Sequence, residues 1–123
     1  MYQRRILIVD DDKGVLTILK ISIERLLPDC QIIVVDDGAT ALTKLRQQPF
    51  DLILTDYDMP HMNGLALAQA ARQISSDIPI VLMSGGYSCR EIKNRAGSTA
   101  LAGFLAKPFT MLQLREILQK NGI

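Results

Sequence analysis

The sequence predicts an α/β domain built on a five-stranded parallel sheet with helices on both faces. Short apolar runs alternate with amphipathic segments, which is the pattern of repeated strand–helix units. The first four runs are continuous in Ile, Val and Leu, as strands buried on both faces of a parallel sheet are. The length of 123 residues fits one domain with one core, residues 1–123.

The predicted strands are the apolar runs themselves. Each is short, rich in aliphatic residues and separated from the next by a segment long enough to hold a crossover helix. The strands are expected at residues 5–10, 31–35, 51–56, 79–84 and 103–106.

Apolar residues at helical spacing mark a helix after each strand. The fourth helix, at about residues 88–98, has the sparsest apolar face. The residues expected to face the core are Val15, Ile18, Leu19 and Leu26 in the first helix, Leu42 and Leu45 in the second, Leu67, Ala68, Ala71 and Ile74 in the third, Cys89, Ile92 and Ala96 in the fourth, and Met111, Leu114, Ile117 and Leu118 in the fifth.

Capping residues agree with these helices. Asp12 is placed to cap the first helix, and Asp37 with Gly38 to open the second. Asn63-Gly64 forms a turn before the third helix. Residues 110–113, Thr-Met-Leu-Gln, have the spacing of a capping box for the fifth.

Acidic residues end two of the predicted strands. At this length, right-handed crossovers favour the doubly wound, flavodoxin-like (βα)5 order 2-1-3-4-5. Its ligand site lies outside the carboxyl ends of the strands, between the first and third. Asp10 and Asp11 end the first run and Asp56 ends the third, so their carboxylates are expected in that crevice.

Crowded carboxylates repel one another unless a cation lies between them. Mg²⁺ (or Mn²⁺) suits a site with few carboxylates, retained waters and a phosphate. The site has about three negative charges, from Asp10, Asp11 and Asp56. It has about three positive charges, from Mg²⁺ and from Lys107, which ends the fifth run, so its net charge is close to zero. A carboxylate so held can attack phosphorus, while Lys107 and the hydroxyl of Ser84, at the end of the fourth run, bind other phosphoryl oxygens.

Over essentially its whole length the chain resembles the receiver domain of response regulators, the phosphoacceptor domain of two-component systems and phosphorelays. The resemblance is specific because several short motifs occur in the right order and spacing. These motifs are residues 6–12 (Ile-Leu-Ile-Val-Asp-Asp-Asp), 51–56 (Asp-Leu-Ile-Leu-Thr-Asp), Met59-Pro60, Asn63-Gly64, Ser84, Gly103-Phe104 and Lys107-Pro108-Phe109.

The resemblance implies the roles of the site residues. Asp56 would be phosphorylated by a sensor histidine kinase or a phosphotransfer protein. Asp11 and Asp56 would bind Mg²⁺ directly, with the backbone carbonyl of Asp58, while Asp10 would act through water. The bond between Lys107 and Pro108 would be cis.

The resemblance also implies a signalling switch rather than an enzyme: the domain would catalyse only its own phosphorylation and slow dephosphorylation. Ser84 and Phe104 would occupy the switch positions, although Phe104 stands where many members have Tyr and therefore lacks a hydroxyl. The output would be a change in the face formed by the fourth helix, fifth strand and fifth helix. A downstream effector, or a second copy in a homodimer, would bind there.

Two other functions stay open. Asp56-Tyr57-Asp58 resembles the Asp-x-Asp start of haloacid-dehalogenase-type phosphatases, although that motif should end the first strand. A pseudo-receiver that only binds a partner is the other alternative, and the acids, Ser84 and Lys107 argue against it.

Several residues have simple structural interpretations. Asp12 is expected to be a helix cap, Asp58 a turn residue facing water, and His61 a solvent-facing loop residue. Phe104 could be plain core. The methionines expected to serve as packing residues are Met59, Met62, Met83 and Met111.

Composition excludes other classes of function. The formal charge of +1 gives no reason to expect direct binding to nucleic acid or to an anionic membrane. No apolar run approaches the length of a membrane span, and the charged start is not a signal peptide. Cys30 and Cys89 are interpreted as reduced thiols of a cytoplasmic protein rather than a disulfide.

Overall fold

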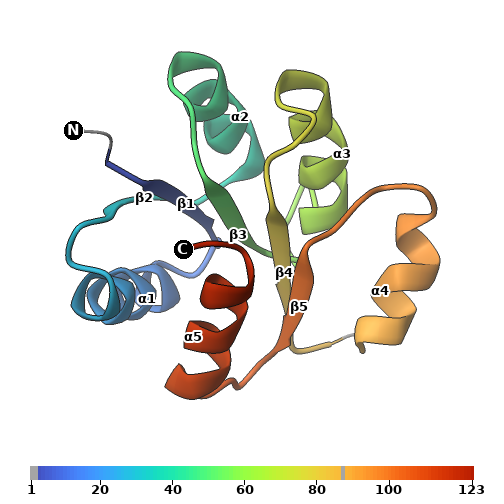
Figure 1. The fold of residues 1–123 in the computed structure, drawn as a ribbon. Coiled ribbons are helices and arrows are strands. Elements are labelled where there is room, and N and C mark those ends of the chain that lie inside the picture. Colours follow the sequence, from blue (N-terminus) through green and yellow to red (C-terminus); the bar gives the residue numbers. More distant parts are fainter. Residues whose placement is uncertain (1–2, 87) are drawn as a thin grey trace.

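In the computed structural model, which describes residues 3–86 and 88–123, five parallel strands form one sheet in the order β2-β1-β3-β4-β5 (Figure 1). This is the predicted order, and every strand bound agrees with the sequence prediction to within one residue. The strands are β1 (Arg5–Val9), β2 (Gln31–Val35), β3 (Leu52–Asp56), β4 (Ile80–Ser84) and β5 (Gly103–Ala106).

A helix follows each strand, and its first turn is capped by a polar side chain. Asp12 and Asp37 accept backbone N–H groups at the first two helices, and Asn63 does so at the third. Thr110 and Gln113 form the predicted capping box. The helices are α1 (Lys13–Leu26), α2 (Gly38–Gln47), α3 (Gly64–Ile74), α4 (Cys89–Ala96) and α5 (Met111–Lys120).

The helices cover the two faces of the sheet unequally. Alternate strand residues point to opposite faces, so Leu7 and Val9 join one apolar cluster while Ile6 and Ile8 join the other. The first cluster packs against α2, α3 and α4, and the second against α1 and α5. Both faces of the central strands are therefore buried, which explains their continuous apolar sequence.

Three residues that were predicted to face the core are exposed instead. Ile18 is 66% exposed, because α1 is turned so that Leu16, Leu19 and Ile23 face the sheet. Met111 and Cys89 are exposed at the first residues of α5 and α4. Helical side chains lean toward the N-terminus, so a first-turn residue covers the space beyond the helix end rather than the sheet.

Leu26 was also predicted to face the core, but it is only partly buried and belongs to neither apolar cluster, whereas its neighbour Leu27 packs against the second. Met59 and Met83 are buried, and Met62 packs against the first cluster. Cys30 and Cys89 carry free thiols. Within the described ranges 3–86 and 88–123, none of the helices has both the length and the apolar character that crossing a membrane requires.

Candidate functional site

The carboxyl edge of the sheet carries the polar side chains. Asp10 directly follows β1, Asp56 is the last residue of β3, and Ser84 is the last residue of β4. Lys107 directly follows β5. Since all the strands are parallel, these four residues are delivered to the same edge.

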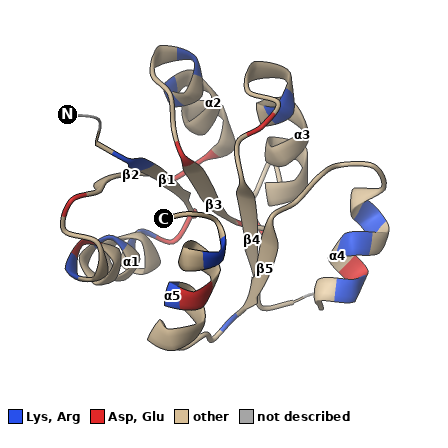
Figure 2. Cartoon of the chain, in the orientation of Figure 1, with Lys and Arg blue, Asp and Glu red and all other residues tan. Residues whose placement is uncertain are grey.

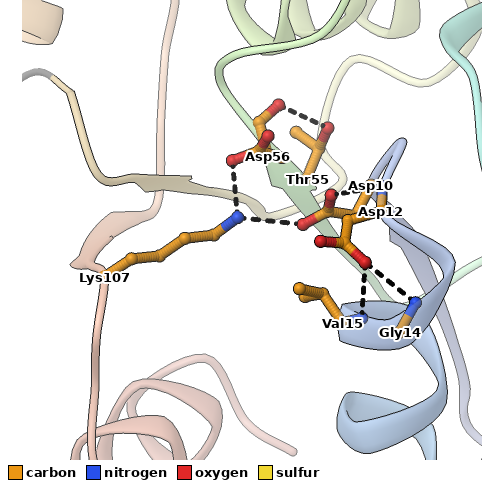
Figure 3. A network of polar contacts seen from close by, with 7 residues as sticks. All are labelled: Asp10, Asp12, Gly14, Val15, Thr55, Asp56 and Lys107. Carbon is orange, nitrogen blue, oxygen red and sulfur yellow. Dashed lines mark hydrogen bonds and ion pairs between the residues drawn. The ribbon is translucent and has the colours of Figure 1, made fainter.

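Lys107 bridges the two buried carboxylates. Its Nζ lies 3.0 Å from Asp10 Oδ2 and 2.9 Å from Asp56 Oδ1 (Figure 3). Its backbone N–H donates to the carbonyl of Ser84 at 2.9 Å, and its bond to Pro108 is cis, the isomer that the resemblance implied. The structure therefore brings the cation and both acids into one charge-paired centre.

Burial and charge act in opposite directions on this centre. Burial raises the pKa of Asp56, and the nearby negative charge of Asp10 adds to this, while the hydrogen bond from Lys107 opposes it. For Lys107, burial favours the neutral amine, yet the hydrogen bonds to Asp56 and Asp10 outweigh it and raise the pKa of the lysine. The ammonium form of Lys107 is therefore held firmly between two acids.

Three carboxylates are close enough to share a cation. Oxygens of Asp10, Asp11 and Asp56 lie within 4.8 Å of one another. Asp10 and Asp56 are buried, whereas Asp11 is exposed and leaves one side of the group open to water. An all-oxygen donor set with an open side fits Mg²⁺, which keeps several of its waters in proteins.

The other two nearby acids lie apart from this group. Oδ1 of Asp12 accepts the N–H groups of Gly14 and Val15 at 2.9 and 3.2 Å, so this carboxylate caps α1 as predicted. The side chain of Asp58 is exposed and lies near Gly86. It is not one of the three carboxylates that are close enough to share a cation.

The two predicted switch residues line one pocket near α4 and α5. Ser84 is buried at the end of β4, and Phe104 is partly buried in β5. The Nζ of Lys93 lies 5.6 Å from the centroid of the Phe104 ring, within the range of a cation–π contact. The ring is therefore held against α4.

Sequence reasoning missed two features beside Asp56. Gly64 was expected only as a turn residue, but a Cβ there would lie 3.0 Å from the Cα of Tyr57 and closer still to the carbonyl oxygen of Asp56. Tyr57 is buried, and its hydroxyl accepts a hydrogen bond from Arg95 of α4 at 3.1 Å. No local pattern signals this pair, because its members are 38 residues apart.

His61 lies in the loop between β3 and α3 and is exposed, as predicted. Its φ of 68° is in the left-handed region that most residues avoid, and the N–H of Met62 donates to the carbonyl of Pro60 across it at 2.7 Å. The loop that follows Asp56 is thus held in a tight turn.

Comparison with known proteins gives a consistent result. A sequence model of the response regulator receiver domain matches residues 6–119. The chain is 31% identical over 117 residues to the response regulator receiver protein CpdR of Brucella abortus and covers 95% of each protein. It is 36% identical over 118 residues to the chemotaxis protein CheY of Pseudomonas aeruginosa, covering 94% of each.

Solved structures agree at the level of the fold. The chemotaxis protein CheY4 of Vibrio cholerae superposes with a TM-score of 0.87 at 26% identity, over 97% of this chain and 98% of that one. Some other relatives are much longer, and the chain spans between 13% and 30% of the length of these proteins.

Proposed function

The chain belongs to the response regulator receiver domain family, and we propose that it is a signalling switch that accepts a phosphoryl group on Asp56. The donor is a sensor histidine kinase or a phosphotransfer protein of a cytoplasmic two-component system. One observation carries the proposal: Asp56 Oδ1 lies 2.9 Å from Lys107 Nζ, within a group of three carboxylates whose oxygens lie within 4.8 Å of one another.

In the proposed reaction a carboxylate oxygen of Asp56 attacks the phosphorus of a phosphohistidine. The phosphorus–nitrogen bond breaks, the imidazole of the donor leaves and takes up a proton, and Asp56 becomes an acyl phosphate. Lys107, already 2.9 Å from Asp56, is placed to neutralise charge on the phosphoryl oxygens. The buried hydroxyl of Ser84 at the neighbouring strand end is the proposed second phosphoryl contact.

Asp10, Asp11 and Asp56 are the residues proposed to hold Mg²⁺ (or Mn²⁺), with the backbone carbonyl of Asp58. When bound, the cation supplies charge neutralisation for the phosphoryl oxygens. Asp10 is also held by Lys107 and by the N–H of Asp12 at 3.0 Å, which supports an indirect role for this residue, through water.

The proposed output is a change in the face formed by α4, β5 and α5. Phosphoryl on Asp56 biases an existing equilibrium of that face rather than creating a new shape. The proposed partner is a downstream effector protein or domain, or a second copy of the chain. Gln113, Glu116 and Ile117 of α5 line the same pocket as Phe104 of β5 and Ile92 of α4, so these three elements share one surface.

The phosphatase alternative has less support. Its Asp-x-Asp motif should end the first strand, whereas Asp56 ends the third strand along the chain. A pseudo-receiver remains an outcome of the test below.

The proposal is tested with acetyl phosphate and Mg²⁺, with the mass of the intact protein as the measurement. We expect one phosphoryl adduct on the wild-type protein and none on Asp56→Asn. The matched control is Asp77→Asn, an exposed acid in the loop before β4, which should still form the adduct.

An adduct on Asp56→Asn equal to that of the wild type would refute the assignment of the acceptor. A wild-type protein that neither binds Mg²⁺ nor accepts phosphoryl from any donor would instead support the pseudo-receiver.

A further inference from the structure

Tyr57 directly follows the phosphoacceptor, and its backbone is tied to the site on both sides. Its N–H donates to the carbonyl of Met83 at 2.7 Å, and its carbonyl accepts from the N–H of Gly64 at 2.9 Å. Only 4% of the residue is exposed. Tyr57 therefore cannot shift without moving the end of β3, which carries Asp56.

The Tyr57 hydroxyl links this backbone to α4. It accepts a hydrogen bond from Nη1 of Arg95, in the last turn of α4, at 3.1 Å. A guanidinium only donates and stays charged, so the hydroxyl is the acceptor in a charge-assisted bond. Such a bond is stronger than one between neutral groups.

Helix α4 has few other attachments to the core. Only Ile92 and Ala96 among its residues are buried. Figure 2 shows that most of its charges are basic. It follows β4 by a short connection that includes the exposed glycines Gly85 and Gly86. The cation–π contact of Lys93 with Phe104 is another attachment of this helix. Because so little apolar area anchors α4, the charge-assisted bond to Tyr57 is one of the few contacts that fix its position.

We propose that Tyr57 is a positioning residue that, through Arg95, holds α4 in the place seen here and opposes the movement that accompanies phosphorylation. This inference rests on the proposed function. Only residues 85–88 separate Ser84, the last residue of β4, from Cys89, the first residue of α4, so drawing Ser84 toward a phosphoryl group on Asp56 would move the start of α4. A bond that forms in only one position of α4 shifts the equilibrium toward that position.

The test uses beryllofluoride, a phosphoryl mimic, titrated in the presence of Mg²⁺. Tyr57→Phe keeps the ring and removes only the hydroxyl, and we expect it to bind beryllofluoride about three- to tenfold more tightly than the wild type. Arg95→Met is expected to have the same effect. The effect of the double variant is expected to be smaller than the sum of the two single effects, because both substitutions remove the same Tyr57–Arg95 bond.

The control is Arg90→Met, which removes an exposed positive charge from the first turn of the same helix. Its affinity for beryllofluoride should equal that of the wild type. A second measurement needs no metal. Urea unfolding without Mg²⁺ of the wild type, Tyr57→Phe, Arg95→Met and the double variant should give a non-zero coupling free energy between Tyr57 and Arg95.

Unchanged or weaker binding by Tyr57→Phe, or additive effects in the double variant, would overturn the inference alone. A wild-type protein that binds no beryllofluoride would overturn the proposed function as well, before any variant is compared.

Discussion

At the scale of single residues, an ion pair with Lys107 offsets the free-energy cost of burying Asp10 and Asp56. A buried carboxylate is costly unless it is paired, and Lys107 pairs with both at 3.0 and 2.9 Å. The same ammonium group is available to a phosphoryl group attached to Asp56. One lysine thus serves the stability of the site and its proposed chemistry.

Replacement of Lys107 by Met should remove this cation while keeping the length of the side chain. Because charge neutralisation is the main protein contribution to phosphoryl transfer, we expect the rate of phosphorylation by acetyl phosphate to fall about a hundredfold. The rate is measured by intact mass against time. Lys120→Met, an exposed lysine at the end of α5, should react at the wild-type rate. Equal rates for Lys107→Met and the wild type would contradict this role.

Gly64 is required by a close approach of two backbone segments. A Cβ on Gly64 would lie 3.0 Å from the Cα of Tyr57, so Gly64→Ala must push backbone rather than a flexible side chain. We expect it to lower the free energy of unfolding by about 1–3 kcal/mol, measured by urea denaturation. At Gly85 the nearest atom to a Cβ is 3.7 Å away, so Gly85→Ala should change stability by less than about 0.5 kcal/mol. Similar losses for both variants would contradict the steric explanation.

At the scale of elements, each helix begins at a polar cap that its own sequence supplies. The N–H of Thr40 donates to Asp37 Oδ1 at 2.7 Å at the start of α2. This bond favours the ionised carboxylate and lowers the pKa of Asp37 below its ordinary value of 3.8. The exposed position of Asp37 means that water screens much of the effect.

The cap should make stability depend on pH in acid. The folded state binds the Asp37 proton more weakly than the unfolded state, so the stabilisation is present above 3.8 and is lost as pH falls through the folded pKa. Asp37→Asn keeps a capping oxygen but has no proton to bind. The free energy of unfolding of the wild type, minus that of Asp37→Asn, should therefore decrease as the pH is lowered from neutral to about pH 3, as measured by urea unfolding. A constant difference over this range would refute the linkage.

At the scale of the whole molecule, parallel strands gather three carboxylates at one edge of the sheet, where Mg²⁺ binding would be linked to folding. A ligand that binds only the folded state stabilises it by mass action. The free energy of unfolding should therefore rise by about 1.4 kcal/mol when Mg²⁺ is at ten times its Kd. EDTA should reverse the rise.

Asp11→Asn removes one proposed ligand at an exposed position, so the fold should persist while the response to Mg²⁺ is lost. Asp29→Asn, an exposed acid before β2 at the opposite edge of the sheet, should respond as the wild type does. An equal response of Asp11→Asn and the wild type would place the cation elsewhere.

Much of the architecture was predictable because its causes are local. Apolar runs buried on both faces identified the strands, and Asp12, Asp37 and Thr110 marked the helix starts through bonds to N–H groups within three residues. The orientation of a helix about its axis is less local. Ile18 fits a helical period but faces water, because packing against the sheet selects among several similar apolar stripes.

Residue type and spacing were enough to predict the strands, the caps and the kinds of side chain that end each strand, and general rules for parallel sheets then gave the strand order. The contacts of Lys107 with both Asp10 and Asp56, and of the Tyr57 hydroxyl with Arg95, could be identified only in the folded molecule. The difference lies in how far apart along the chain the interacting residues are. Secondary structure depends on energies between near neighbours, whereas these contacts join residues up to 97 positions apart and exist only once the sheet has assembled.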